Sequence, residues 1–422
     1  MSSANAHNSG SRRRGGYKRR QSHAAAQSEP FRPRKVPQHP LVPAGEPELI
    51  DTDQALTDLL EHVRQVGRCC YDSEFIGESF YFPHLCLVQV ATPQRVAVID
   101  ALARLDLRPI WEMLSDESVE KIVHAGAQDL EPVVRHLGRA PANVFDTQIV
   151  AGLAGLPYPL SLTRLTQSLL DVRLGKGLTF TSWDQRPLST PHLHYAADDV
   201  RFGPALHAEL LGRLERLGRV HWARQQCGSL CDASRYRLDL TEVARKIRGA
   251  KDLRRPQAAV LCELVGLRDE IARLHDLPPR STLRDEVLLD LARRSPVMAK
   301  DLDSIRGLPR PIKADFGSRL LEAVGRGLEK RQPPWATEPQ HDETPEEQFR
   351  VDTLWAAAQA WCRSLGVDPS LVATRSDLGD AIRTGVLPPR VAHGWRGELL
   401  GEFAAKFLAG DRRIELRWNG AK

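Results

Sequence analysis

RCCYDSEFIG (residues 68–77) is a strand-like run that carries two carboxylates, Asp72 and Glu74, two positions apart. In a β-strand, side chains two positions apart point to the same face, so both carboxylates are expected on one side of a sheet. Two carboxylates this close repel one another unless a cation neutralises them. The stretch therefore predicts a strand of an α/β domain, with a divalent-metal site on one of its faces.

Three more residues in two other stretches extend this set: Asp129 in HAGAQDLEP (residues 124–132), and Tyr195 with Asp199 in HYAADDVRF (residues 194–202). Tyr195 and Asp199 are four apart in a helical run, so they share one helix face. Asp129 lies near a predicted helix start, where the helix dipole favours a carboxylate. Any one of these residues alone would be read as a cap, a solvated charge or a core residue.

Taken together, the four carboxylates suit chemistry on phosphate with two Mg²⁺ or Mn²⁺ ions, which lie about 3.5–4 Å apart in such sites. In this interpretation Asp72 bridges both ions, while Glu74 and Asp199 complete the ligands of the first. Asp129 serves the second ion, and neutral Tyr195 orients the attacking water.

The pattern from residue 46 to 235 alternates strand and helix, which predicts an α/β domain with a mixed sheet. Residues 84–92 and 95–101 follow the first strand closely enough to form a meander with it. Residues 190–218 are predicted to form one long helix, with Thr190 as its cap and Pro191 in its first turn.

The remaining sequence divides by composition and charge. Residues 1–45 carry nine Lys or Arg against one Glu and few aliphatic residues, which predicts a disordered basic tail. Residues 241–330 are helical, with 19 Lys or Arg against 14 Asp or Glu. Residues 331–345 are predicted to be a linker, and residues 346–422 a second helical domain.

Several classes of protein are excluded. No apolar run approaches the ~20 residues of a membrane helix, and the first residues lack the apolar segment of a secretory signal. Seven cysteines without a CxxC pair predict free thiols in a reducing cytoplasm. A helicase motor is excluded because no G-x-x-x-x-G-K-[ST] loop occurs.

YDSEF, HAGAQDL and YAADDV resemble the three exonuclease motifs of the ribonuclease D family, in the tyrosine-bearing branch of the DEDD 3′–5′ exonucleases. FDTQIVAGLAG and SWDQRPLS agree with this resemblance, which covers residues 46–235. It implies a ribonuclease H-like α/β domain with a mixed sheet and two bound Mg²⁺ or Mn²⁺ ions. It also implies five catalytic residues, of which all but the tyrosine bind metal: Asp72, Glu74, Asp129, Tyr195 and Asp199. The motif spacing selects Asp199 over its neighbour Asp198.

Residues 264–296 with IRGLP (305–309) resemble the HRDC domain, which implies an auxiliary nucleic-acid-binding module. GVDPSLVATRSDL (366–378) and GWRGELLG (394–401) resemble a second HRDC-like module. The expected architecture is therefore an exonuclease domain followed by two small all-α domains. Lys176, Trp183 and Arg186 lie in the loop before the last catalytic helix. A role in binding the substrate phosphate and ordinary loop packing both remain open for them.

The leading hypothesis is a metal-dependent 3′–5′ exoribonuclease that releases nucleoside 5′-monophosphates. By resemblance, its substrates are 3′ ends of stable RNAs such as tRNA precursors. A DNA 3′–5′ exonuclease and a catalytically silent RNA-binding scaffold are the alternatives. RNA is the expected partner, with DNA kept open, and we expect a cytoplasmic monomer that binds no membrane.

Overall fold

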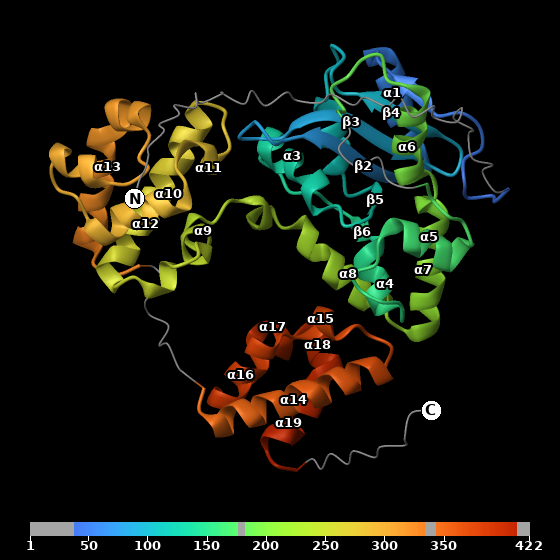
Figure 1. Cartoon of the computed structure of the whole chain (residues 1–422). Helices are drawn as coiled ribbons and strands as arrows, with labels where there is room; N and C mark the ends of the chain where they lie inside the picture. The colour runs from blue at the N-terminus through green and yellow to red at the C-terminus, as the bar shows by residue number, and fades with distance from the viewer. Residues whose placement is uncertain (1–37, 176–181, 334–342, 412–422) are drawn as a thin grey trace, which may run out of the picture. The chain divides into compact units, whose positions relative to one another are not determined.

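The computed structural model describes residues 38–175, 182–333 and 343–411. A six-stranded mixed sheet lies at the centre of the first domain, with the strand order β1-β4-β3-β2-β5-β6 (Figure 1). Strands β2, β3 and β4 form the predicted antiparallel meander, while β1, β5 and β6 each run parallel to a neighbour. The strands are β1 (Glu48–Ile50), β2 (Arg68–Ile76), β3 (His84–Ala91), β4 (Val96–Asp100), β5 (Glu120–Val123) and β6 (Val144–Asp146).

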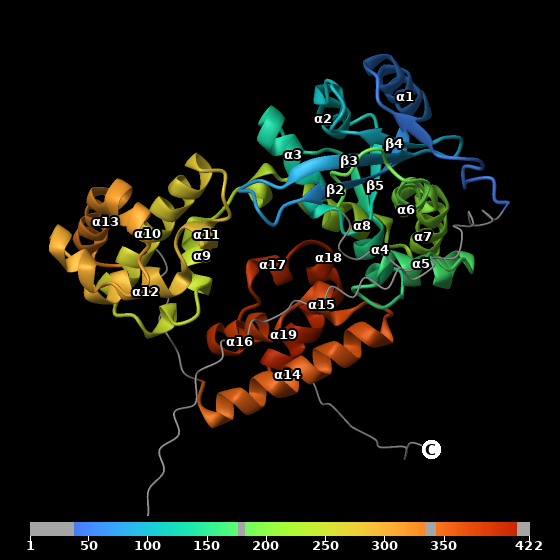
Figure 2. The ribbon, with the colours of Figure 1, turned by 45° about the horizontal axis from the view of Figure 1, so that its top comes forward.

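Helices cover both faces of this sheet, as Figure 2 shows. Cys69 and Tyr71 of β2 pack into a core with α1, α2 and α3, whereas Cys70 packs into a core with α4 to α8. The period of two then places Asp72 and Glu74 on the second face. The helices are α1 (Asp53–Val66), α2 (Arg108–Leu114), α3 (Ala127–Leu137), α4 (Thr147–Leu153), α5 (Leu162–Leu170), α6 (Thr190–Arg201), α7 (Gly203–Leu217) and α8 (Val220–Gly228).

The single long helix predicted for residues 190–218 is wrong, because the chain breaks at Phe202 into α6 and α7. Pro204 has no N–H to donate to the carbonyl four residues earlier, so the helical ladder is interrupted there. Gly203 is required by space at this break: a Cβ on it would lie 2.3 Å from Cys70 Sγ. The break therefore brings the backbone of α7 directly against strand β2.

The domain also begins earlier than predicted. Residues 38–45, predicted to belong to the disordered tail, include Val42, which is only 5% exposed. The buried guanidinium of Arg201 donates hydrogen bonds to the carbonyls of Pro43 and Gly45, which fixes this segment. Strand β1 and helix α1 were also not predicted. Residues 1–37, the rest of the predicted tail, lie outside the described residues.

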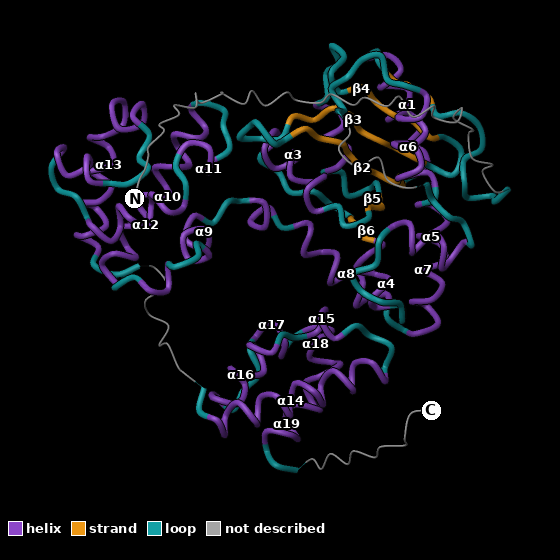
Figure 3. The backbone as a smooth tube through the Cα atoms, in the orientation of Figure 1, coloured by secondary structure: helices purple, strands orange, loops and turns teal. Residues whose placement is uncertain are grey.

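The rest of the described chain contains helices and no strand (Figure 3). The first module has a buried core of its own, as the sequence predicts for residues 241–330. Its helices are α9 (Leu240–Lys246), α10 (Arg255–Leu274), α11 (Pro279–Thr282), α12 (Asp285–Arg294) and α13 (Arg310–Lys330), with 3₁₀ turns that include η4 (Ala299–Ser304). The second module contains α14 (Pro345–Ser364), α15 (Pro369–Val372), α16 (Arg375–Thr384), α17 (Pro389–Ala392), α18 (Gly394–Arg396), the π-helical turn η5 (Gly397–Gly401) and α19 (Glu402–Leu408).

The two helical modules repeat one arrangement. Helices α10, α11 and α12 of the first module and helices α14, α15 and α16 of the second are 20, 4 and 10 residues long. Each of these helices begins 90 residues after its counterpart (255 and 345, 279 and 369, 285 and 375). Leu288 and Leu378, which correspond in this register, are both fully buried. The helix succession therefore supports the prediction that the last module is related to the first.

Two expectations about the chain as a whole can be compared with the structure. All seven cysteines are free thiols, as predicted. Within the three described ranges, none of the helices combines the length and the hydrophobicity that a transmembrane segment needs.

Candidate active site

Four of the five predicted catalytic residues line one cavity of about 330 Å³: Asp72, Glu74, Tyr195 and Asp199. Strand β2 supplies the first two and helix α6 the others. Ser189 caps α6 by accepting a hydrogen bond from the His192 N–H, and the helix then places Tyr195 and Asp199 one turn apart on the face toward the sheet. The side chains that the strand period and the helix period each place on one face thus lie together at one site.

Asp129, the fifth residue, reaches the site through a contact that the sequence does not indicate. The hydroxyl of Ser73, between Asp72 and Glu74 on β2, donates a 2.5 Å hydrogen bond to Asp129 Oδ1. Asp129 lies in the first turn of α3, and Gly126 precedes this helix in a tight turn. A Cβ on Gly126 would lie 2.5 Å from the side chain of Val123, so the turn has room only for glycine.

The electrostatics are those of carboxylates held close together out of water. Burial, and then the charges of Asp129, Asp199 and Glu74, raise the pKa of Asp72 well above its usual range. Burial and Asp129 raise the pKa of Glu74 to about 7, and burial and Glu74 raise the pKa of Asp199 to about 8. Without a cation, the folded protein therefore favours protonated forms of these groups.

Tyr195 stays a neutral phenol in this setting. Burial and the neighbouring carboxylates, Asp199 first, raise its pKa to about 12. Its ring stacks on that of Trp183, with centroids 6.0 Å apart and an interplanar angle of 29°. A neutral, stacked phenol fits the predicted role of orienting a water molecule better than that of a strong base.

The donor set suits hard divalent cations, because every metal ligand predicted from the sequence is a carboxylate. In residues 38–175, 182–333 and 343–411, however, no three His, Cys, Asp or Glu side chains are already arranged around a common metal position. The carboxylates have to turn toward a cation when it binds.

Of the three residues in the loop before α6, Lys176 lies outside the described residues, and the other two have structural partners. Trp183 is buried, and the proximity of its side chain to Glu74 lowers the pKa of that carboxylate, partly offsetting the effect of its burial. Arg186 makes two 2.6 Å hydrogen bonds to Asp100 and also bonds the carbonyls of Cys86, Trp183 and Gln185. The contacts thus favour loop packing over phosphate binding for Arg186, and they place Trp183 in the buried surroundings of Glu74.

Replacing Arg186 by alanine is expected to lower the free energy of unfolding by about 2 kcal/mol. The change leaves the largely buried carboxylate of Asp100 and three carbonyls without their donor, and partial exposure of the pair tempers the cost. Thermal and denaturant unfolding would measure it, with the exposed Arg164→Ala as control. If Arg186 instead bound the substrate phosphate, its variant would keep wild-type stability and show a raised KM for RNA.

Known proteins are similar to this chain over both the exonuclease domain and the helical modules that follow. Ribonuclease D of Bartonella henselae is 30% identical over 369 residues, which are 86% of this chain and 90% of that protein. The chain belongs to the ribonuclease D family. Ribonuclease D of Gluconacetobacter diazotrophicus is 33% identical, over 85% of this chain and 92% of its own length. The crystal structure of Escherichia coli RNase D, described as an exoribonuclease involved in structured RNA processing, matches with a TM-score of 0.74 and 28% identity. This match covers 87% of this chain and 100% of that one.

Two family models divide the chain in the same way. A 3′–5′ exonuclease family matches residues 47–215, which contain all five predicted catalytic residues, and an HRDC domain matches residues 257–324. Like its ribonuclease D relatives, the protein is a 3′–5′ exoribonuclease, and RNA is its substrate. The exonuclease family to which it belongs depends on divalent metal ions.

Proposed function

We propose that the protein removes nucleotides from RNA 3′ ends by a two-metal mechanism and releases nucleoside 5′-monophosphates. The observation that carries this proposal is the shared cavity, in which Asp72, Glu74 and Asp199 lie together and the charges of Glu74 and Asp199 raise the pKa of buried Asp72. Holding these carboxylates together destabilises the folded protein unless cations bind there. Asp72, Glu74, Asp129 and Asp199 would hold two Mg²⁺ or Mn²⁺ ions, which supply an activated water and stabilise the leaving oxygen.

The residues of the chain then have separate tasks. Tyr195, a neutral hydroxyl at the cavity, orients the water for attack on the last phosphodiester. Ser73 fixes the Asp129 carboxylate by a hydrogen bond, and the Trp183 side chain lies beside the Glu74 carboxylate. Trp183 and Ser73 limit the rotamers of the two carboxylates. Less side-chain entropy is therefore lost when the substrate binds.

For the substrates we propose 3′ ends of stable RNAs such as tRNA precursors, processed by a monomer. The HRDC module supports a structured substrate, because it adds a second region that can contact nucleic acid. The match to the Escherichia coli enzyme, whose description names structured RNA processing, points the same way.

The proposal is tested by offering RNA and DNA of identical sequence, each labelled at its 5′ end, with Mg²⁺, Mn²⁺ or EDTA. We expect stepwise shortening of RNA from the 3′ end, nucleoside 5′-monophosphates among the products, and no reaction in EDTA. Equal or faster shortening of DNA would establish a DNA exonuclease instead. Full activity in EDTA, or nucleoside 3′-monophosphates as products, would contradict the two-metal mechanism.

The raised pKa values predict how stability depends on pH. Asp199 and Glu74 titrate near 8 and 7 in the folded protein but near 4 when unfolded, so folding takes up protons. The free energy of unfolding of the metal-free protein should therefore fall as the pH rises from about 4 to 8. Asp199→Asn should progressively exceed the wild type in thermal midpoint across this range, by roughly 2–4 °C for each kcal/mol removed.

A divalent cation should reverse this trend. We expect Mg²⁺ or Mn²⁺ to raise the thermal midpoint of the wild type more at pH 8 than at pH 5, because protons and cations compete for the same oxygens. If the thermal midpoints of Asp199→Asn and the wild type differ by the same amount at pH 5 and pH 8, the pKa of this carboxylate is not raised in the folded protein.

A further inference from the structure

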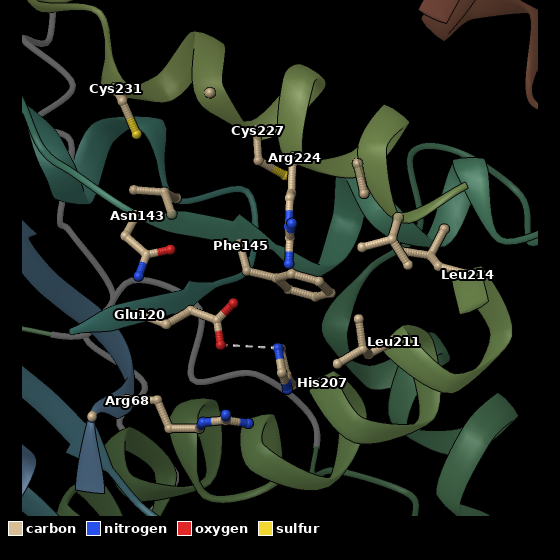
Figure 4. Close-up of a pocket in the computed structure, with 15 residues that line it drawn as sticks. Arg68, Glu120, Asn143, Phe145, His207, Leu211, Leu214, Arg224, Cys227 and Cys231 are labelled. Carbon is tan, nitrogen blue, oxygen red and sulfur yellow. Dashed lines mark ion pairs between the residues drawn. The ribbon is translucent and has the colours of Figure 1, made fainter. Parts of the chain in front are cut away.

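A second cavity, of about 610 Å³, lies at the amino ends of three strands, away from the catalytic carboxylates (Figure 4). Strands β2, β5 and β6, which run parallel to one another, begin there with Arg68, Glu120 and Val144, and α7 and α8 complete its wall. The two cavities share no residue. They are neighbours along α7, which gives Leu206 to the catalytic cavity and His207 to the second.

One side of this cavity is apolar. The ring of Phe145 points into it below Arg224 in Figure 4, and Leu211, Leu214 and Val220 extend the same surface. Phe145 also meets the edge of the His207 ring, with centroids 4.4 Å apart. This packing holds the phenyl ring in place as a flat surface.

The other side is charged, and its two arginines are free. In the described part of the chain, the guanidinium groups of Arg68 and Arg224 donate no hydrogen bond and form no ion pair. Glu120 is already engaged, since its Oε2 lies 3.2 Å from Nε2 of the buried His207, outside regular hydrogen-bond geometry. Contact with His207 lowers the pKa of Glu120, and Arg68 and Arg224 lower it further. Two free guanidinium groups against one ionised carboxylate leave the site with net positive charge.

We propose that this cavity binds a nucleoside monophosphate, with its phosphate on the arginine side and its base against the Phe145 surface. Guanidinium groups match phosphate oxygens in charge and geometry, and the carboxylate of Glu120 can accept hydrogen bonds from ribose hydroxyls. The volume lies in the range of small-molecule sites, about 300–1,000 Å³. Such a ligand is either a free mononucleotide or the phosphorylated end of an RNA chain.

Isothermal titration calorimetry on the full chain in EDTA tests the proposal. The Asp72→Asn variant is used, so that nothing is hydrolysed. Without cations the catalytic site has no metal ion to attract phosphate, so the heat reports binding elsewhere. We expect AMP to bind at least about tenfold more tightly than adenosine or inorganic phosphate, since each of these lacks one half of the contacts. A 5′-phosphorylated adenosine dinucleotide that binds more tightly than AMP identifies the ligand as an RNA end, and one that binds more weakly identifies the free nucleotide.

Variants then locate the binding. Arg68→Gln and Arg224→Gln should each weaken AMP binding about tenfold, and Leu211→Trp, which fills the cavity, should abolish it. Arg216→Gln, on the exposed face of α7 and outside the cavity, serves as the matched control. Thermal midpoints, together with exonuclease rates of the same substitutions in the wild-type chain, should stay unchanged. Binding of AMP that is insensitive to both arginines, or no binding at millimolar AMP, would overturn the proposal.

Discussion

Replacing Asp72 by asparagine is expected to reduce the rate of RNA shortening by about a thousandfold or more, which corresponds to about 4 kcal/mol of transition-state stabilisation. Asparagine keeps the size of the side chain but removes the charge that both proposed ions would share. The charges of Asp129, Asp199 and Glu74 all act on Asp72, which places it among the other three carboxylates. No neighbour can therefore take over its position. Single-turnover rates with saturating Mg²⁺ or Mn²⁺ measure the effect.

The matched control is Asp198→Asn, on the same helix as Asp199 and one residue away. Asp198 lies 3.5 Å from the guanidinium of Arg201 and does not line the catalytic cavity, so its variant should keep activity close to that of the wild type. The melting temperature of Asp72→Asn shows whether a loss of activity comes from lost catalysis or from lost folding. Metal-free Asp72→Asn should melt at or above the wild-type temperature, because a buried, repelled carboxylate has been removed. A wild-type rate in Asp72→Asn would rule out the proposed mechanism.

Replacing Tyr195 by phenylalanine is expected to lower kcat by about a hundredfold, the lower end of the range for a group that positions a proton transfer. Phenylalanine keeps the ring that stacks on Trp183 and removes only the hydroxyl. The affinity for RNA and for divalent cations should therefore stay close to that of the wild type. Single-turnover rates, RNA binding and metal titration on the same preparation separate these quantities.

Tyr158→Phe is the control for this substitution, since Tyr158 is a half-buried tyrosine of the same domain that does not line the cavity. It should leave kcat unchanged. A Tyr195→Phe variant with wild-type kcat would show that the water is oriented without the phenol. A variant with normal kcat but a raised KM would instead assign Tyr195 to substrate binding.

The sequence predicted most of the fold and the residues of the candidate site, since these depend on short-range patterns. The period of two in β2 placed Asp72 and Glu74 on one face, and the helical period placed Tyr195 above Asp199. The mixed sheet followed from strand runs too close together for a crossover helix. The family motifs added Asp129, whose position no local period connects to the other four.

Contacts between distant segments were not predictable in this way. The bond from Ser73 to Asp129 joins residues 56 positions apart, and the pair of Arg186 with Asp100 joins residues 86 apart. For Arg186 the sequence left phosphate binding and loop packing open, and its contacts favour loop packing. The break between α6 and α7 had local signals in Gly203 and Pro204, but the closeness of Gly203 to Cys70 appears only in the fold.

By itself, then, the sequence determined which carboxylates exist and which face of its own strand or helix each one occupies. Backbone geometry dictates that much within a few residues, whatever the rest of the chain does. Only the tertiary structure decided what each side chain meets: Asp129 is held by Ser73, Glu74 lies near Trp183, and the guanidinium groups of Arg68 and Arg224 are left free beside a second cavity. Packing brings these groups together because it buries the apolar faces of the sheet and its helices, and that choice of neighbours is a property of the whole chain.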